Sequence, residues 1–360
     1  MASASLPDDL VLEVLQRVKD VATLFRCRTT LSLRFSNVSL RFSLVPNIND
    51  KFNQPVPLTS RQGLLLVRLN RYQGCGLLGV CNLITGAFDV LPPLQHTWSS
   101  DSNHLAGYAI LTARDCSSSR DHPEEQQLPF FKVMILTIDV NMMQYNLQTI
   151  SSANASGWKI SFGSLEKNKS QSIYMVLRQH NAVVCRGMAH WLFSSTSGLY
   201  TLDVDARTDH VSFTNLLDMG RIDNYFGRPT YDAPYLAVNG KGKLMLVYLN
   251  KGGYRLEICT SHNNGRWHHA LARKLKQPNQ KKNEKKTQGE VLYTCLGEKN
   301  GTLIIKDNHH DAYVIDINTG VVQEVIDSPH TRRLNRGKIV PFEMDWPAFF
   351  VSQLAVVPTW

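Results

Sequence analysis

The sequence predicts a mainly β protein with a small α-helical motif near its N-terminus, followed by a kelch-like β-propeller of about five to seven blades. Three observations carry this prediction: one amphipathic helical stretch, many short β-rich runs, and a repeated strand–turn–strand unit. The chain has 360 residues, and its 43% apolar residues are enough for a buried core. The charged fraction is only 19%, so a wholly disordered chain is excluded.

The clearest helical pattern covers residues 6–28. Pro7 suits the first helical turn, and the carboxylates of Asp8 and Asp9 interact favourably with the positive end of a helix dipole. Apolar residues then recur at three- and four-residue spacing, with polar residues on the opposite side, and a second short helix is predicted over 21–28. The recurring apolar residues are Leu10, Val11, Val14, Leu15 and Val18.

After Pro46 the chain changes to short β-rich runs separated by Gly, Asn, Asp and Pro. Many short strands with turn signals between them indicate a sandwich, a barrel or a propeller. The predicted strand regions are 63–69, 77–83, 131–140, 182–193, 243–249, 302–307 and 312–317.

An internal repeat favours the propeller. Residues 137–158 align without a gap to 246–267 with six identities, and the unit ends in a Trp at both places, Trp158 and Trp267. Asn or Asp after an apolar–polar–apolar run is interpreted as one equivalent hairpin turn, because both residues tolerate left-handed backbone. These turns are 45 to 68 residues apart, and removing the Lys-rich stretch from the longest gap leaves about 50 residues, near the period of a kelch-type blade. The turn residues are Asn82, Asn141, Asp205, Asn250 and Asn318.

The net charge of +9 is confined to two segments. Residues 273–286 carry net +6 and residues 331–338 carry net +4, which leaves −1 for the rest of the chain. A nucleic-acid-binding fold would spread its basic residues over one face, so nucleic acid is not an expected partner. The Lys-rich stretch 273–290 is interpreted as a solvated loop inserted into a blade, and a nuclear localisation signal or a phosphate-contacting loop remain alternatives.

Cysteine usage and the N-terminal sequence indicate a soluble protein of a reducing compartment, cytoplasmic, nuclear or both. The seven cysteines are widely spaced without a CxxC, and the N-terminus has an acidic pair where a signal peptide would be apolar. No apolar stretch is long enough to span a membrane, so no membrane association is expected.

No cofactor, metal or catalytic motif is expected either. The adjacent histidines at 268–269 and 309–310 would point to opposite faces of a strand, and the glycine-rich stretches 74–76 and 240–243 lead into no helix. Arg186, His190 and Trp191 are interpreted as parts of a blade core and not as a substrate site, because a strand Trp usually packs between blades.

Residues 6–28, LPDDLVLEVLQRVKDVATLFRCR, resemble the opening of an F-box, the helical motif that docks onto the Skp-family adaptor of cullin–RING ubiquitin ligases. The rest of the chain resembles the F-box-associated propeller region of plant F-box proteins, particularly those of grasses. The matching phrases are VCRGMAHWLF at 184–193 and EMDWP at 343–347. The resemblance implies an F-box-like helical motif over 1–45 and an F-box-associated propeller-like domain over 46–360.

This resemblance implies the substrate-recognition subunit of an SCF-type cullin–RING E3 ubiquitin ligase, without catalytic residues of its own. The N-terminal helices would bind the Skp-family adaptor and, through it, the cullin, while the propeller binds a target protein. An amphipathic stripe laid into an apolar groove is a recurrent mode of recognition. The residues that would face the adaptor are Leu6, Pro7, Leu10, Val14, Leu15, Val18, Leu24 and Phe25.

The third helix of the motif is interpreted as degenerate. An F-box continues into a basic, Trp-containing helix, whereas residues 31–42 alternate in the manner of a strand and no Trp precedes Trp98. A second hypothesis is therefore a non-catalytic propeller interaction module whose decayed F-box no longer binds the adaptor. A third, a propeller enzyme of glycan or redox type, requires ionisable groups with perturbed pKa values clustered at the central channel.

Overall fold

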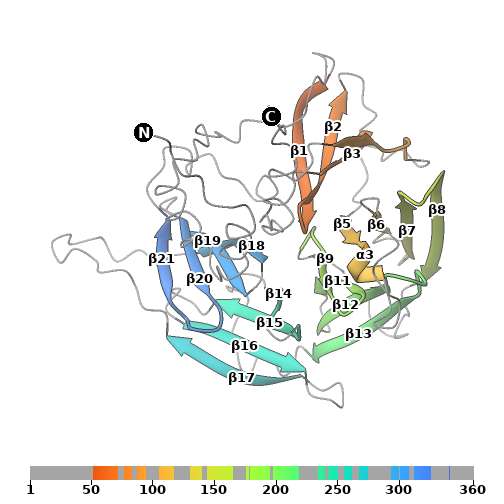
Figure 1. Ribbon diagram of the computed structural model, residues 1–360. Coiled ribbons are helices and arrows are strands. Elements are labelled where there is room, and N and C mark those ends of the chain that lie inside the picture. The colour runs from red at the N-terminus through yellow and green to blue at the C-terminus, as the bar shows by residue number, and fades with distance from the viewer. Residues whose placement is uncertain are drawn as a thin grey trace, which may run out of the picture.

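The structure is a computed structural model of the chain (Figure 1). The predicted helical motif over 1–45, with all the residues expected to face the adaptor, lies outside the described residues. The structure describes residues 52–71, 77–82, 87–94, 105–116, 130–139, 144–164, 176–177, 179–194, 198–218, 234–239, 242–249, 255–261, 267–274, 293–299, 301–307, 312–325 and 340.

The described strands form five sheets, and the first two are antiparallel meanders of four strands whose order follows the chain. When a short turn joins two strands, the second runs antiparallel beside the first, so strands that are consecutive in the chain are neighbours in the sheet. β6 is buried on both faces, as its unbroken apolar run requires. A short helix, α3 (Ala113–Cys116), follows β5. The strands are β1 (Phe52–Arg61), β2 (Leu64–Arg71), β3 (Leu77–Asn82), β4 (Phe88–Val90), β5 (Leu105–Thr112), β6 (Phe131–Asp139), β7 (Gln144–Ser151) and β8 (Asn154–Ser164).

The third, fourth and fifth sheets repeat the same meander. In the third sheet the first strand is interrupted, so that β9 and β10 pair with successive parts of β11. The strands are β9 (Val176–Leu177), β10 (Val183–Cys185), β11 (Met188–Ser194), β12 (Gly198–Asp205), β13 (Val211–Asp218), β14 (Tyr235–Val238), β15 (Leu244–Leu249), β16 (Arg255–Ser261), β17 (Trp267–Lys274), β18 (Tyr293–Lys299), β19 (Thr302–Asp307), β20 (Ala312–Asp316) and β21 (Val322–Val325).

The sheets stack face to face in chain order, and alternation along the second strand of a sheet assigns its side chains to two neighbours. In β6, Val133 and Ile135 pack with the first sheet, whereas Met134 and Leu136 pack with the third. The fourth sheet packs between the third and the fifth in the same way. Because successive residues of a strand point to opposite faces, each second strand contributes to two separate apolar layers.

The first strands lie toward a common centre. β1 contacts β5, β5 contacts β9 and β10, β10 contacts β14, and β14 contacts β18. The later strands of each sheet extend outward from this centre, as Figure 1 shows most clearly for β14–β17 and β18–β21. The prediction of a mainly β, propeller-like fold is confirmed by this arrangement, and every predicted strand region contains a strand.

The interruption between β9 and β10 ties three sheets together near the centre. In β5, Tyr108 donates its backbone N–H to the carbonyl of His180 (2.6 Å) and accepts a bond from the N–H of Ala182 (2.8 Å). The Gln179 side chain reaches the other way, to the fourth sheet. Its amide oxygen accepts from the backbone N–H of Leu236 (2.8 Å), and its amide nitrogen donates to the Leu236 carbonyl (3.2 Å).

The predicted repeat of 137–158 and 246–267 is confirmed for the two tryptophans that end it. Trp158 lies in β8 and Trp267 begins β17, the fourth strands of their sheets, and both are buried. Each packs toward the preceding sheet, and the Trp158 indole Nε1 donates to the carbonyl of Pro92 after β4 (2.8 Å).

The turn assignment was wrong in one respect, because the predicted Asn/Asp positions belong to two kinds of turn. Asn141 and Asn250 follow second strands, whereas Asp205 ends a third strand, and these turns lie at opposite ends of a meander. In the fifth sheet the residue equivalent to Asp205 is Asp316 and not Asn318, because the Asp316 carboxylate caps its turn as Asp205 does. A spacing counted across both kinds of turn is therefore not a true period.

The Lys-rich segment connects two sheets. Residues 273–274 end β17, the last strand of the fourth sheet, and β18 begins the fifth sheet at Tyr293. The remaining residues of the predicted loop, 275–290, lie outside the described residues. The segment therefore lies on a connection between sheets, where the sequence suggested a position inside one.

Candidate interaction face

One side of the propeller-like domain carries the turns that join first to second strands and third to fourth strands; we call it the turn face. Two of its hairpin turns have two residues each, both with positive φ: 44° and 83° at Gln62 and Gly63, and 51° and 74° at Arg186 and Gly187. Positive φ at both positions is typical of a type I′ turn, whose twist matches that of the flanking strands.

Turns after third strands on this face are held by an aspartate. The Asp205 carboxylate accepts hydrogen bonds from the backbone N–H of Arg207 (2.9 Å) and of Thr208 (2.8 Å). Asp316 does the same for the two N–H groups that follow it by two and three residues, both at 2.8 Å. Such bonds lower the pKa of Asp205, although its burial acts in the opposite sense.

The two turns of one sheet are also bonded to each other. Gly187 O accepts a hydrogen bond from the N–H of Ala206 (2.8 Å), and in the fifth sheet Gly301 O accepts one from Ile317 (2.8 Å). These backbone hydrogen bonds hold the two turns of a sheet in place relative to each other. The turn face is therefore rigid at the third and fifth sheets.

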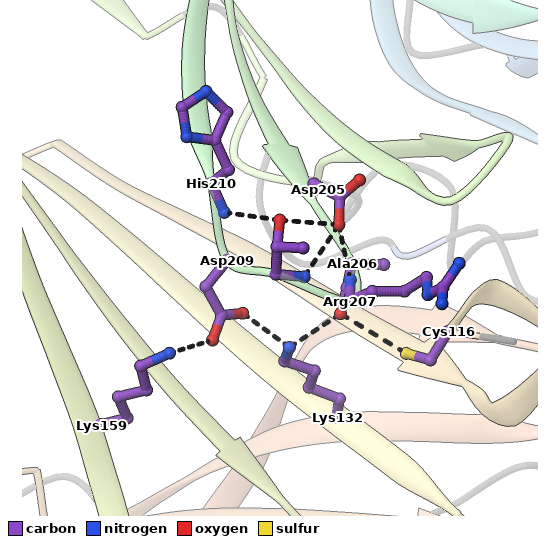
Figure 2. A network of polar contacts seen from close by, with 9 residues as sticks. Cys116, Lys132, Lys159, Asp205, Ala206, Arg207, Asp209 and His210 are labelled. Carbon is purple, nitrogen blue, oxygen red and sulfur yellow. Dashed lines mark hydrogen bonds and ion pairs between the residues drawn. The ribbon is translucent and has the colours of Figure 1, made fainter.

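An aspartate joins the third sheet to the second (Figure 2). Asp209 forms an ion pair with Lys132 of β6 (2.6 Å) through one carboxylate oxygen, and its other oxygen accepts a hydrogen bond from Lys159 of β8 (2.9 Å). Lys132 also donates to the carbonyl of Ala206 (2.7 Å). The Lys132 and Asp209 side chains are 11% and 9% exposed, whereas Lys159 is 64% exposed. The buried pair therefore holds this turn, and Lys159 adds an outer contact.

Asp209 has a backbone conformation that usually favours glycine. Its φ is +60°, and the equivalent position in the fifth sheet is Gly320, with φ +70°. A side chain in the left-handed region costs free energy that glycine avoids. The ion pairs with Lys132 and Lys159 give the aspartate a contact that a glycine cannot make.

A second ion pair joins the first sheet to the second. Arg61, at the end of β1, donates to Asp115 of α3 at 2.7 Å and, through Nε, at 3.3 Å. Thr112 donates its backbone N–H to the same carboxylate (3.0 Å), which orients it. Next to it, burial raises the pKa of Cys116 to about 11, although Lys132 acts against this. Cys116 is therefore a neutral thiol. The Arg61–Asp115 and Lys132–Asp209 ion pairs together link the first three sheets on the turn face.

The residues singled out in the phrase 184–193 take three different positions. Trp191 is fully buried between the second and third sheets, which confirms that it belongs to the blade core. Arg186 lies in the two-residue turn. His190 is hydrogen-bonded to Asp203 (2.7 Å) and lies 3.5 Å from the Cys185 sulfur.

The buried links were not predicted from the sequence. Asp115, Lys132 and Asp209 occur singly, and each finds its partner more than fifty residues away in the chain. One local pattern in the sequence pointed to Asp209: it follows Asp205 and Thr208 at the same spacing at which Gly320 follows Asp316 and Thr319, so it replaces a turn glycine.

The turn face offers a rigid polar surface. Arg207 and His210 are exposed beside the Lys132–Asp209 pair (Figure 2), and Thr208 is exposed as well. Within the described ranges no group of three or more His, Cys, Asp or Glu could hold a metal ion. No helix in the same ranges is long and apolar enough to cross a membrane. Fixed donors and charges of this kind suit recognition of another surface.

Comparison with known proteins gives similarity at the level of solved structures. No family model and no curated protein sequence matches the chain. A protein from Lactobacillus plantarum matches with a TM-score of 0.40 and 9% identity, covering 76% of this chain and 70% of that one. A Mycobacterium tuberculosis puromycin-hydrolyzing peptidase matches with a TM-score of 0.38 and 12% identity, covering 77% of this chain and 39% of that one. A Trypanosoma rangeli sialidase matches with a TM-score of 0.38 and 12% identity, covering 77% and 49%.

Proposed function

We propose that this chain is a non-catalytic substrate-recognition subunit of an SCF-type cullin–RING ubiquitin ligase. The observation that carries the proposal is the order of two features: the amphipathic LPDD-led pattern of residues 6–28, then a stack of propeller-like sheets. The first suits docking into an apolar adaptor groove, and the second suits presentation of a fixed surface.

In this proposal the N-terminal residues bind a Skp-family adaptor and the turn face binds the target protein. The subunit accelerates ubiquitin transfer by raising the effective concentration of the target near the charged enzyme. Buried charge pairs support this role, because a surface that is already fixed loses less entropy on binding. The cytoplasm, the nucleus or both are the compartments that the proposal requires.

A second candidate is a propeller interaction module that no longer binds the adaptor. The observation that favours it is the strand-like alternation of residues 31–42, where an F-box has its third helix. Both candidates are non-catalytic, and they differ only in adaptor binding.

Mixing the full-length chain with a purified Skp-family adaptor tests the proposal. The first candidate predicts a complex that migrates as one species in size-exclusion chromatography. Separate migration of two folded proteins at micromolar concentration would contradict it and favour the second candidate.

A further inference from the structure

Four polar side chains gather on the face of the third sheet that packs toward the fourth. The Cys185 sulfur lies 3.5 Å from Nε2 of His190, and Nδ1 of His190 lies 2.7 Å from an Asp203 oxygen. The other Asp203 oxygen accepts from the Thr214 hydroxyl (2.6 Å). We call Cys185, His190, Asp203 and Thr214 the thiol relay.

Strand register explains why these residues meet. His190 of β11 pairs with Val183 of β10 on one side and with Asp203 of β12 on the other. Cys185 is two residues beyond Val183, so it points to the same face. The relay lies beside the 186–187 turn, and the apolar layer shared with the fourth sheet continues from it.

The contacts assign a role to each ring nitrogen. Asp203 accepts a hydrogen bond from the Nδ1–H of His190 and is itself held by Thr214, so Asp203 and Thr214 are positioning residues. The imidazole is thereby oriented with Nε2 toward the sulfur. A nucleophile within reach of a base that a third group orients is the arrangement that activates serine and cysteine.

The pKa of His190 is consistent with this geometry. Burial by itself lowers the pKa of His190, but the hydrogen bonds and charges of Asp203 and Cys185 raise it to about 9. The imidazolium is therefore present at neutral pH, with its Nε2 3.5 Å from the Cys185 sulfur. Burial raises the pKa of Cys116 to about 11 and that of Cys259 to about 12, and it also raises the pKa of Cys81.

We propose that Cys185, 8% exposed beside the 186–187 turn, is a modification site, a nucleophilic cysteine activated by His190 that reacts with hydroperoxides at the turn face. Its sulfur attacks the terminal oxygen of the hydroperoxide, so the S–O bond forms as the O–O bond breaks. The leaving alkoxide or hydroxide takes the proton from Nε2 of His190. The sulfur is oxidised by two electrons to a sulfenic acid, and the hydroperoxide is reduced to an alcohol or water.

The test measures each cysteine of the folded, full-length chain by mass spectrometry after iodoacetamide labelling between pH 5.5 and 9. At pH values below its pKa of about 8.5, an unperturbed thiol reacts roughly ten times faster for each unit by which the pH increases. At neutral pH we expect Cys185 to label roughly tenfold faster than Cys116 and Cys259, whose pKa values are raised by burial.

A second arm uses hydrogen peroxide with a sulfenic-acid trap. The trap is expected on Cys185, and the His190→Asn variant should lose labelling at pH 6.5 by roughly tenfold or more. Thr214→Val, a milder change at the far end of the relay, should reduce labelling of Cys185 at pH 6.5 by less than His190→Asn does. Labelling of wild-type Cys185 that is no faster than that of Cys116 and Cys259, or an unlabelled Cys185 in the folded protein, would overturn the proposal without any variant.

Discussion

Trp191 shows how one side chain depends on a residue from another sheet. It is fully buried, and its indole lies against Gly107 of β5 so closely that an added Cβ would overlap the ring. Gly107→Ala is expected to cost about 1–3 kcal/mol in the free energy of unfolding, because the core cannot shift to admit the methyl group. Chemical denaturation measures this cost.

A double variant provides the control for this prediction. In the Trp191→Phe background the smaller ring leaves room at Gly107, so the same substitution should cost much less. An equal cost in both backgrounds would show that the Trp191 contact is not its cause.

The second residue-scale prediction concerns Asp209. Asp209→Asn keeps a side chain that tolerates positive φ but leaves the buried Lys132 without its counter-charge. Loss of one partner from a buried pair costs about 3 kcal/mol, whereas Lys159→Ala, at the 64% exposed position, should cost less than about 1 kcal/mol. Comparable destabilisation by the two variants would contradict a special role for the buried pair.

The third prediction is a pH dependence from His190 and Asp203. The folded pKa of His190, about 9, lies above its unfolded value near 6.5, so its contribution is complete below pH 6.5 and is lost as pH rises through 9. The hydrogen bond with His190 lowers the pKa of Asp203 against the effect of burial, so its contribution is lost only in acid. Stability from this pair is therefore greatest from about pH 4 to 6.5.

His190→Asn separates this effect from other titrations. The difference in unfolding free energy between wild type and variant should shrink by on the order of 2–3 kcal/mol between pH 6 and pH 9.5. A difference that stays constant over this range would show that His190 is not protonated in the folded protein.

At the scale of elements, the interruption between β9 and β10 yields the fourth prediction. Gln179 makes two hydrogen bonds to the backbone of Leu236 in the fourth sheet. Gln179→Leu should cost about 1–3 kcal/mol, because it leaves a backbone N–H and a carbonyl without these partners. Gln179→Glu keeps the acceptor but loses the donor, so its cost should be smaller; thermal unfolding of the three proteins ranks them, and a wild-type-like Leu variant would contradict the role of this bridge.

Strands and single turns could be predicted from the sequence, because they depend on neighbours in the chain. The regions 131–140 and 243–249 are examples, since each contains a strand, whereas 182–193 was predicted as one run and is divided into β10 and β11 by the Arg186–Gly187 turn. The equivalence of turns was not predictable, since Asn318 and Asp316 both look like turn residues until the hydrogen bonds are known. The relay and the buried ion pairs depend on register between strands, which the sequence does not state.

At the scale of the whole molecule, the described sheets stack in chain order and share apolar layers with their neighbours. The turn face is linked across three sheets by Arg61–Asp115 and Lys132–Asp209. Such an assembly suits a rigid surface that binds a target protein while a separate motif docks onto the adaptor. The N-terminal pattern of residues 6–28 supplies that motif in our proposal.

The fifth prediction tests this central claim by adaptor binding with matched substitutions. Leu10→Asp with Val14→Asp charges the apolar stripe, and Gln16→Asp with Arg17→Asp places equal substitutions on the polar side of the same stretch. Isothermal titration of each full-length protein with a Skp-family adaptor measures the affinity. The account predicts a Kd below about 10 μM for the wild type and the polar-side variant, and no binding for the stripe variant. No binding by folded wild-type protein, or equal binding by both variants, would contradict it.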